Sequence, residues 1–429
     1  MVGISIWEDV CTMPICQSGA KRRVYMDYAA ASPVDERVLS EMMPYFSDDF
    51  GNPSSLHGSG RGPKDAVEDA REKVAGLINA KRKEEIIFTS GGTEANNLGI
   101  KGAAMRMRKK GKHIVTSAIE HISVLNIMKY LQKNGFEVTY VPSTPEGFVD
   151  IEQLRSSIRD DTILVSVMYA NNEIGTLQPI IEIGDMIRGK EIRFHVDAVA
   201  ATGKVPIDVQ SLGTDLMTIS SNDMYGPKGV GALYVKDGVS VEAMGQGGGQ
   251  ERGLRSGSEN VPGIVGFGTA AELAANEMVE EGARLTRLRD RLVKGMRGNV
   301  QDVFLNGHPT RRLPNNANFR FRYIEGESML LNLDMMGISV SSSSPCTSKS
   351  LLPSHVLLAC DIPTEEAQSA VQFTLGRSNT DDDIDFVIEV VPGIVKKLRA
   401  MSPFSPANIQ EMRSTAGHKE RDEDHHQDG

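Results

Sequence analysis

The chain has 429 residues, more than one hydrophobic core usually serves, so two domains are expected. Its 57 acidic and 47 basic side chains give a net charge of −10, which argues against nucleic acid or an anionic membrane as the main partner. No apolar run reaches the length of a membrane span, and no basic segment followed by an apolar core opens the chain. We therefore expect a cytoplasmic protein, and its four cysteines fit a reducing compartment.

Residues 1–24 are expected to form an N-terminal extension ahead of the first patterned segment, which starts at Tyr25. Cys11 and Cys16 lie in this extension with four residues between them. A zinc site would need further ligands at comparable spacing, and no matching pair is present. The two cysteines therefore make a weak case for a metal site.

The segment 25–278 is predicted to be a large α/β domain. Between Glu85 and Val235, short β-rich runs alternate with amphipathic stretches, which is typical of a largely parallel sheet. The six predicted strands are 86–89, 113–116, 137–141, 163–167, 193–196 and 216–219.

Polar residues follow several of these strands at the point where each strand ends. Ligands of parallel sheets bind at the carboxyl ends of the strands, so residues in these positions are expected to share one site. The five residues are Thr93, His121, Asn172, Asp197 and Ser220.

The turn at 89–96 predicts a phosphate site. Gly92 and Thr93 open a helix there and leave backbone N–H groups free at its N-terminus, where donors and helix dipole favour an anion. A tight turn with Thr93 as helix N-cap is the alternative. Ser220 from another strand end and Ser258 from a glycine-rich loop could add hydroxyl donors. Three groups of donors favour a phosphomonoester.

Three further residues have two interpretations each. The carboxylate of Asp197 can pair with a protonated pyridine nitrogen or cap the following helix. His121 is either a proton carrier or a structural histidine. The planar guanidinium of Arg377 suits a substrate carboxylate, with a surface ion pair as the alternative.

The C-terminal part of the chain predicts a second, smaller domain. The segment 276–300 carries four apolar residues at helical spacing, and we place the domain change near it. Residues 279–403 are then expected to form an α+β domain, and 404–429 a disordered polar tail. The four apolar residues are Leu285, Leu288, Leu292 and Met296.

Two cysteines of the second domain have contrasting surroundings. Cys346 lies in a Ser-rich segment, 340–354, that contains Pro345 and Pro353, so an exposed, reactive thiolate on a mobile loop is expected. Cys360 ends the apolar run 356–360 and is expected to be a buried structural thiol.

From about Tyr25 to Pro403 the chain resembles the cysteine desulfurases, pyridoxal-phosphate (PLP) enzymes related to class-V aminotransferases, in an archaeal-like variant. The resemblance depends on nine motifs in combination. They are Gly51-Asn-Pro-Ser-Ser55, Thr93-Glu-Ala-Asn96, Glu120-His121, Asn171-Asn-Glu-Ile-Gly175, His195-Val-Asp-Ala198, Tyr225-Gly-Pro-Lys-Gly229, Gly247-Gly-Gly-Gln-Glu251, Arg255-Ser-Gly257 and Cys346-Thr-Ser348.

The resemblance implies the α/β fold of type I PLP-dependent transferases: a large domain with a mostly parallel seven-stranded sheet, plus a smaller C-terminal α+β domain. It implies a homodimer in which Ser258 reaches the phosphate in the neighbouring subunit. His121 would stack on the pyridine ring and shuttle protons, Asn172 would contact the ring, and Arg377 would take the substrate carboxylate. Cys346 would accept sulfur from L-cysteine as a persulfide and pass it to a scaffold protein that builds iron–sulfur clusters.

The departures from the family pattern concentrate on the cofactor. Asn222-Asp223 stands where the family has His-Lys, and Ala200 stands where it usually has a glutamine that bonds the phenolic oxygen of PLP. A Schiff base needs a primary amine, and a carboxylate has no nitrogen, so covalent PLP is not expected. Lys228 lies beyond a Gly-Pro turn and is expected to point elsewhere.

Three hypotheses follow. The chain participates in iron–sulfur assembly, with Cys346 receiving sulfide or ligating a cluster shared with the scaffold protein. Alternatively, it is a working desulfurase that binds PLP without a covalent bond or through another amine. The third hypothesis is a regulatory, non-enzymatic dimer that occupies partners.

Overall fold

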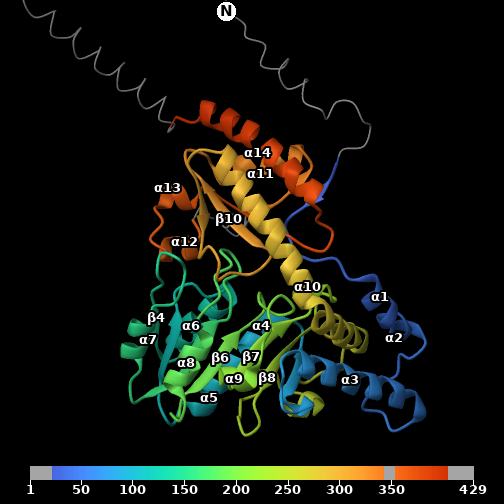
Figure 1. Cartoon of the computed structure of the whole chain (residues 1–429). Coiled ribbons are helices and arrows are strands. Elements are labelled where there is room, and N and C mark those ends of the chain that lie inside the picture. Colours follow the sequence, from blue (N-terminus) through green and yellow to red (C-terminus); the bar gives the residue numbers. More distant parts are fainter. Residues whose placement is uncertain (1–21, 343–352, 404–429) are drawn as a thin grey trace, which may run out of the picture.

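The computed structural model describes residues 22–342 and 353–403. Cys346, Cys11, Cys16 and the predicted polar tail lie outside these residues. The chain forms two bodies, a larger one built from the N-terminal part and a smaller one from the C-terminal part (Figure 1). No helix within the described ranges is both long and apolar enough to cross a membrane.

The larger body is built on a seven-stranded sheet, and the predicted α/β fold class is confirmed. Every neighbouring pair is parallel except those that involve β8, which runs antiparallel between its two neighbours. In spatial order the strands are β2 (Ile86–Thr89), β8 (Gly231–Val235), β7 (Leu216–Ser220), β6 (Arg193–Asp197), β5 (Thr162–Met168), β3 (His113–Ser117) and β4 (Glu137–Val141).

Helices cover both faces of this sheet, as the continuous apolar runs of its inner strands require. One face packs against α3, α8, α9 and the first part of α10, and the other against α4, α5 and α6. The helices of this body are α1 (Glu36–Met42), α2 (Pro44–Ser47), α3 (Gly58–Leu77), α4 (Gly92–Asn96), α5 (Gly102–Met107), α6 (Ile122–Lys133), α7 (Ile151–Ser157), α8 (Ile180–Ile187), α9 (Val209–Leu212) and α10 (Val261–Asn299). Shorter turns of helix span Lys83–Glu85, Asn97–Lys101, Asn222–Met224 and Gln250–Gly253.

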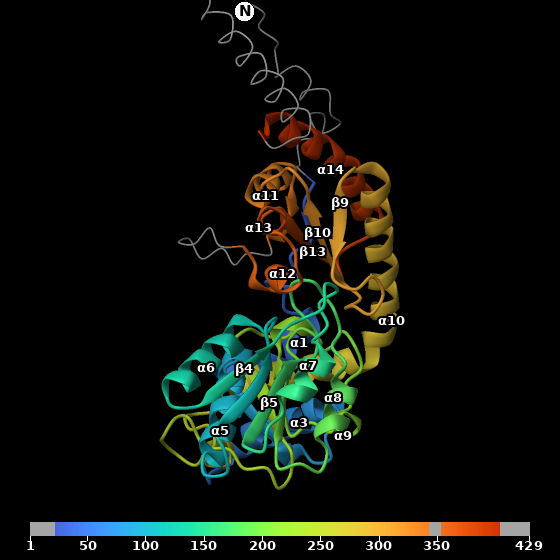
Figure 2. The same ribbon diagram turned by 90° about the vertical axis from the view of Figure 1, so that its left-hand side faces the viewer.

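The long helix α10 belongs to both bodies and runs along one side of the molecule (Figure 2). It starts at Val261, well before the predicted 276, because residues 261–274 are buried and apolar on most sides and therefore lack the amphipathic period of a surface helix. The predicted domain change at 278/279 falls inside this helix. Its later residues Leu285, Leu288 and Leu292 pack into the core of the smaller body.

The smaller body is α+β, with a four-stranded antiparallel sheet in the order β12 (Ser341–Ser342), β13 (Ala370–Thr374), β10 (Asn316–Phe321) and β9 (Val303–Asn306). The start of the described chain joins this body, because β1 (Val24–Tyr25) pairs in parallel with β11 (Ile338–Ser339). Its helices are α11 (Gly326–Met335), α12 (His355–Ala359), α13 (Thr364–Ala367) and α14 (Asp381–Met401).

Candidate active site

The carboxyl ends of β3, β5, β6 and β7 lie at one edge of the large sheet, because these strands are parallel. That edge faces the smaller body, since Gln372 of β13 donates a hydrogen bond to the backbone oxygen of Asn172 at 2.7 Å. His121, Asp197 and Ser220 occupy the same edge, at or just after strand ends. The sheet topology therefore brings the predicted polar residues together.

A buried network joins three elements at this edge. The amide nitrogen of Asn96, at the end of α4, donates to Asp197 Oδ2 at 2.7 Å and to Ser123 Oγ at 3.1 Å. Ser123 Oγ in turn hydrogen-bonds His121 Nδ1 at 2.7 Å, and His121 also caps α6 by accepting from Ser123 N. The network fixes Asp197 and the histidine ring relative to the helix that follows β2.

Asp197 has the surroundings expected of a partner for a cationic ring. Burial raises the pKa of its carboxyl group, while the nearby His121 acts to lower it. The side chain also accepts from the backbone N–H of Val199, at 3.1 Å. The alternative role of Asp197 as a helix cap is wrong, because residues 199–204 form turns and the next helix, α9, is capped by Asp208. The Oδ1 atom of Asn96 is buried and has no partner among the described residues, which leaves one acceptor open beside Asp197.

The turn between β2 and α4 has the geometry of an anion cradle. Gly91 has φ = 143°, a backbone conformation that favours glycine, and a Cβ at Gly92 would lie 2.7 Å from the side chain of Val199. Gly91 is the N-cap, so Thr93 is not; Thr93 lies in the first turn with an exposed side chain. Ser220 ends β7, and the buried hydroxyl of the next residue, Ser221, has no partner among the described residues.

The glycine-rich loop that carries Ser258 is fastened to this turn. Arg255 forms an ion pair with Glu94 of α4 at 3.1 Å. Glu251, at the other end of the loop, accepts two hydrogen bonds from Arg71, at 2.7 and 2.8 Å, and one from the backbone N–H of Phe88 in β2. Ser258 itself is exposed.

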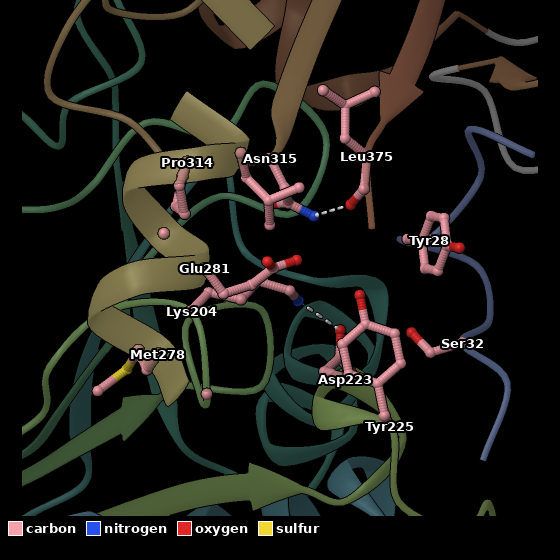
Figure 3. A pocket seen from close by; sticks show the side chains of 13 residues that line it. Tyr28, Ser32, Lys204, Asp223, Tyr225, Met278, Glu281, Pro314, Asn315 and Leu375 are labelled. Atoms are coloured by element: carbon pink, nitrogen blue, oxygen red, sulfur yellow. Dashed lines mark hydrogen bonds and ion pairs between the residues drawn. The ribbon is translucent and has the colours of Figure 1, made fainter. Parts of the chain in front are cut away.

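The opposite side of the site carries Asp223, at the predicted position of the missing lysine. Asp223 forms an ion pair with Lys204, whose Nζ lies 3.0 Å from Asp223 Oδ1 and 3.2 Å from the backbone oxygen of Ala200 (Figure 3). Both side chains of the pair are 12% exposed. They line a cavity of about 30 Å³ on the side of α10, which is room for a water molecule or two; neither His121 nor Asp197 lines it.

The predicted orientation of Lys228 is confirmed. Its Nζ donates to the backbone oxygen of Ser32 at 2.7 Å, away from Asp223. Lys204 is therefore the lysine that contacts the changed position.

Comparison with known proteins agrees with this geometry. The aminotransferase class-V model matches residues 24–387. The chain belongs to the class-V aminotransferase family, in its cysteine desulfurase branch.

It is 56% identical over 380 residues to cysteine desulfurase IscS 1 of Archaeoglobus fulgidus, covering 89% of this chain and 99% of that protein. It is 52% identical over 389 residues to cysteine desulfurase IscS of Methanosarcina thermophila, covering 91% and 96%. A solved NifS-like protein superimposes with a TM-score of 0.82 at 38% identity, covering 88% of this chain and all of that one.

The residues present fit the ring and phosphate of PLP, the cofactor of this family. Asp197 and the open acceptor of Asn96 suit the ring, and the Gly91–Gly92 turn with Ser220 suits the phosphate. They do not fit the covalent bond, since Asp223 offers no amine.

Arg377, predicted to bind the substrate carboxylate, is engaged within the chain. Its guanidinium forms ion pairs with Asp35 and, at 2.8 Å, with Glu277, and it stacks 4.4 Å above the ring of Tyr225. A substrate carboxylate would have to compete with these two carboxylates.

The helix that follows residues 343–352 is anchored to the larger body next to the site. Ser354, the N-cap of α12, donates to Glu173, and His355 Nε2 hydrogen-bonds the backbone oxygen of Glu120 at 2.9 Å. Burial raises the pKa of Glu173 to about 7 and that of Glu120 to about 8. Both carboxyl groups adjoin the predicted residues Asn172 and His121.

Cys360 is a structural thiol, as predicted. It is 3% exposed, belongs to the apolar cluster between the two bodies, and lies near Ser143. Burial raises its pKa to about 11, so its thiolate is scarce at neutral pH.

Sequence reasoning missed three residues of the site: Asn96, Ser123 and Lys204. Asn96 is part of a recognised motif, and its position at the end of the helix after the glycine turn was a usable signal. Lys204 had none, because its contact with Asp223 depends on how two turns meet in space.

Proposed function

We propose that this chain is a cysteine desulfurase family protein of iron–sulfur cluster assembly in which Cys346 handles sulfur for a scaffold protein, while PLP-dependent turnover is impaired at Asp223. One observation carries the part of this proposal that concerns the cofactor. The network of Asn96, Asp197 and His121 is present, whereas the proposed position of the covalent lysine holds a carboxylate paired with Lys204.

The chain's own residues support retention of the cofactor without a covalent bond. Asp197 would hold a protonated ring nitrogen, His121 would lie against the ring and move a proton through its imidazole, and the Gly92–Thr93 turn with Ser220 would hold the phosphate. Asn172 lies at the same edge, and Arg377 follows β13 and pairs with Glu277 of α10. When bound, PLP supplies an electron sink for bonds at the amino acid carbon.

Cys346 would accept sulfur from L-cysteine as a persulfide, where PLP-dependent turnover remains, and would pass that sulfur to the scaffold protein. Where the sulfur source is sulfide, Cys346 would form no persulfide, because that step needs an oxidant. Its thiolate would instead complete the coordination of an iron atom whose other ligands are scaffold cysteines. The anchoring of α12 through Ser354 and His355 supports this role, because it holds the end of the cysteine segment beside the cofactor site.

We further propose a homodimer, in the cytoplasm, in which Ser258 completes the phosphate site of the neighbouring subunit. The exposure of Ser258 and the anchored loop that carries it support this arrangement. A row of exposed apolar side chains on and after α1 and α2 also suits an interface. These are Leu39, Met43, Phe46, Phe50 and Leu56.

The test uses the full chain with a cluster scaffold protein under anaerobic conditions. Cys346→Ser should abolish sulfur transfer and cluster retention by the complex and leave fold and dimer mass unchanged. Cys360→Ser is the matched control, with transfer retained and some stability lost. Unchanged cluster assembly by Cys346→Ser would contradict the proposal and favour a regulatory, non-enzymatic dimer.

A further inference from the structure

We propose that the altered side of the cofactor site selects the amine form of the cofactor, pyridoxamine 5′-phosphate, over the aldehyde form, with Asp223 accepting a hydrogen bond from the ammonium group of the ligand. The inference rests on the cofactor site of the proposed function and is independent of what Cys346 does.

The reach of the side chain supports this selection. The nitrogen of a lysine side chain lies five bonds from Cα, whereas the oxygen of an aspartate lies three bonds from it. A ligand ammonium group at the place of the missing lysine nitrogen would therefore lie about 2.5–3 Å beyond the carboxylate of Asp223. This distance is roughly the length of an N–H···O hydrogen bond. The chain holds an ammonium group at this distance already, because Lys204 Nζ lies 3.0 Å from Asp223 Oδ1.

Asp223 has room for a second donor. A carboxylate offers about four acceptor sites. Lys204 uses Oδ1 only, and no described residue donates to Oδ2. Lys204 is also held by the backbone oxygen of Ala200 at 3.2 Å, so a ligand ammonium can bind Oδ2 without displacing it.

The aldehyde form lacks this contact. Its oxygen accepts hydrogen bonds and does not donate them, so beside Asp223 two acceptors would face each other. Discrimination between the two forms would thus combine a charge-assisted hydrogen bond for one with a repulsive contact for the other.

The chemical consequence concerns the substrate. The aldehyde form can take up the amino group of cysteine, whereas the amine form can join only a carbonyl compound. A site filled with the amine form would therefore not start desulfuration of cysteine, and sulfur would have to reach the protein as sulfide or as a persulfide.

The test is a calorimetric titration of the cofactor-free full chain at pH 7 with each of the two cofactor forms. The parent should bind pyridoxamine 5′-phosphate at least about 10-fold more tightly than PLP, the range expected for a hydrogen bond to a charged group. Asp223→Asn, which keeps the shape and removes the charge, should lose this preference. Lys204→Met should keep or increase it, because Asp223 is then free of its internal cation.

Equal affinities in the parent, tighter binding of PLP, or an unchanged ratio in Asp223→Asn would overturn the proposal. If borohydride reduction attaches PLP covalently to Lys204, the proposal is also overturned, since the chain itself would then supply the amine that binds the aldehyde. Binding of neither form would overturn it as well, while cluster retention through Cys346, measured separately with iron and sulfide, would still decide the proposed function.

Discussion

The two sides of the cofactor site have kept different parts of the family pattern. On the ring and phosphate side, Asn96 and Asp197 form a buried hydrogen bond, and Gly92 is packed against Val199. On the lysine side, Asp223 and Ala200 stand where the resemblance places a lysine and a glutamine, and Lys204 is the partner of Asp223. Groups that also hold the fold together persist, whereas a lysine that serves only chemistry can be replaced.

The replacement depends on the neighbouring cation. A largely buried carboxylate without a partner is strongly destabilising, while one with a close ammonium group is tolerated. Lys204 is therefore the residue that makes Asp223 compatible with a folded site.

Restoring the lysine side should have the largest effect. The double change Asn222→His and Asp223→Lys should turn a chain without covalent cofactor into one that retains PLP stoichiometrically after desalting, because Asp197 and the phosphate turn remain in place. The visible absorbance of the desalted protein measures this. If the double variant gains no binding, the ring and phosphate side is no longer a working site.

Breaking the anchor of the phosphate-side loop should cost the most stability. Arg71→Ala leaves Glu251 buried without its ion partner, for which about 3–5 kcal/mol is expected. Urea unfolding of this variant, with Glu68→Ala as the control on the exposed partner of Arg71, measures the loss. A loss below about 1 kcal/mol, the usual range of a surface pair, would mean that the loop is not held by this pair.

The pH dependence of stability should change at Glu173. Burial raises the pKa of Glu173 from 4.5 to about 7, so the folded protein binds this proton more tightly than the unfolded chain does. The resulting contribution to the free energy of unfolding is full below about pH 4.5 and is lost as pH rises through 7. Glu173→Gln should remove this loss and gain up to about 3 kcal/mol relative to the parent as pH rises from 4.5 to 8. If the free energies of unfolding of the parent and of Glu173→Gln change in parallel with pH, Glu173 titrates normally.

Removing the internal cation should have a smaller effect. Lys204→Met is expected to cost about 2 kcal/mol, less than a fully buried pair because both side chains keep some contact with water. The double variant Lys204→Met and Asp223→Leu should recover most of this loss. If the single variant is as stable as the parent, Lys204 does not compensate Asp223.

The fold and one side of the site could be predicted because they depend on local patterns. Apolar runs predicted the strands, and parallel strands place the residues that follow them, such as His121 and Asp197, at a common edge. The early start of α10 could not be predicted, since a helix that is buried on most sides has no amphipathic period. The contact of Lys204 with Asp223 could not be predicted either, because it joins two separate turns through tertiary packing.

Reductive labelling shows whether the chain offers PLP an amine. The parent protein is incubated with PLP and reduced with borohydride, and the masses of its peptides are measured by mass spectrometry. No peptide of the parent should carry the reduced cofactor, while the double variant treated in the same way should carry it on the lysine introduced at position 223. Stoichiometric labelling of the parent at Lys204 or Lys228 would show that the chain does supply an amine to PLP.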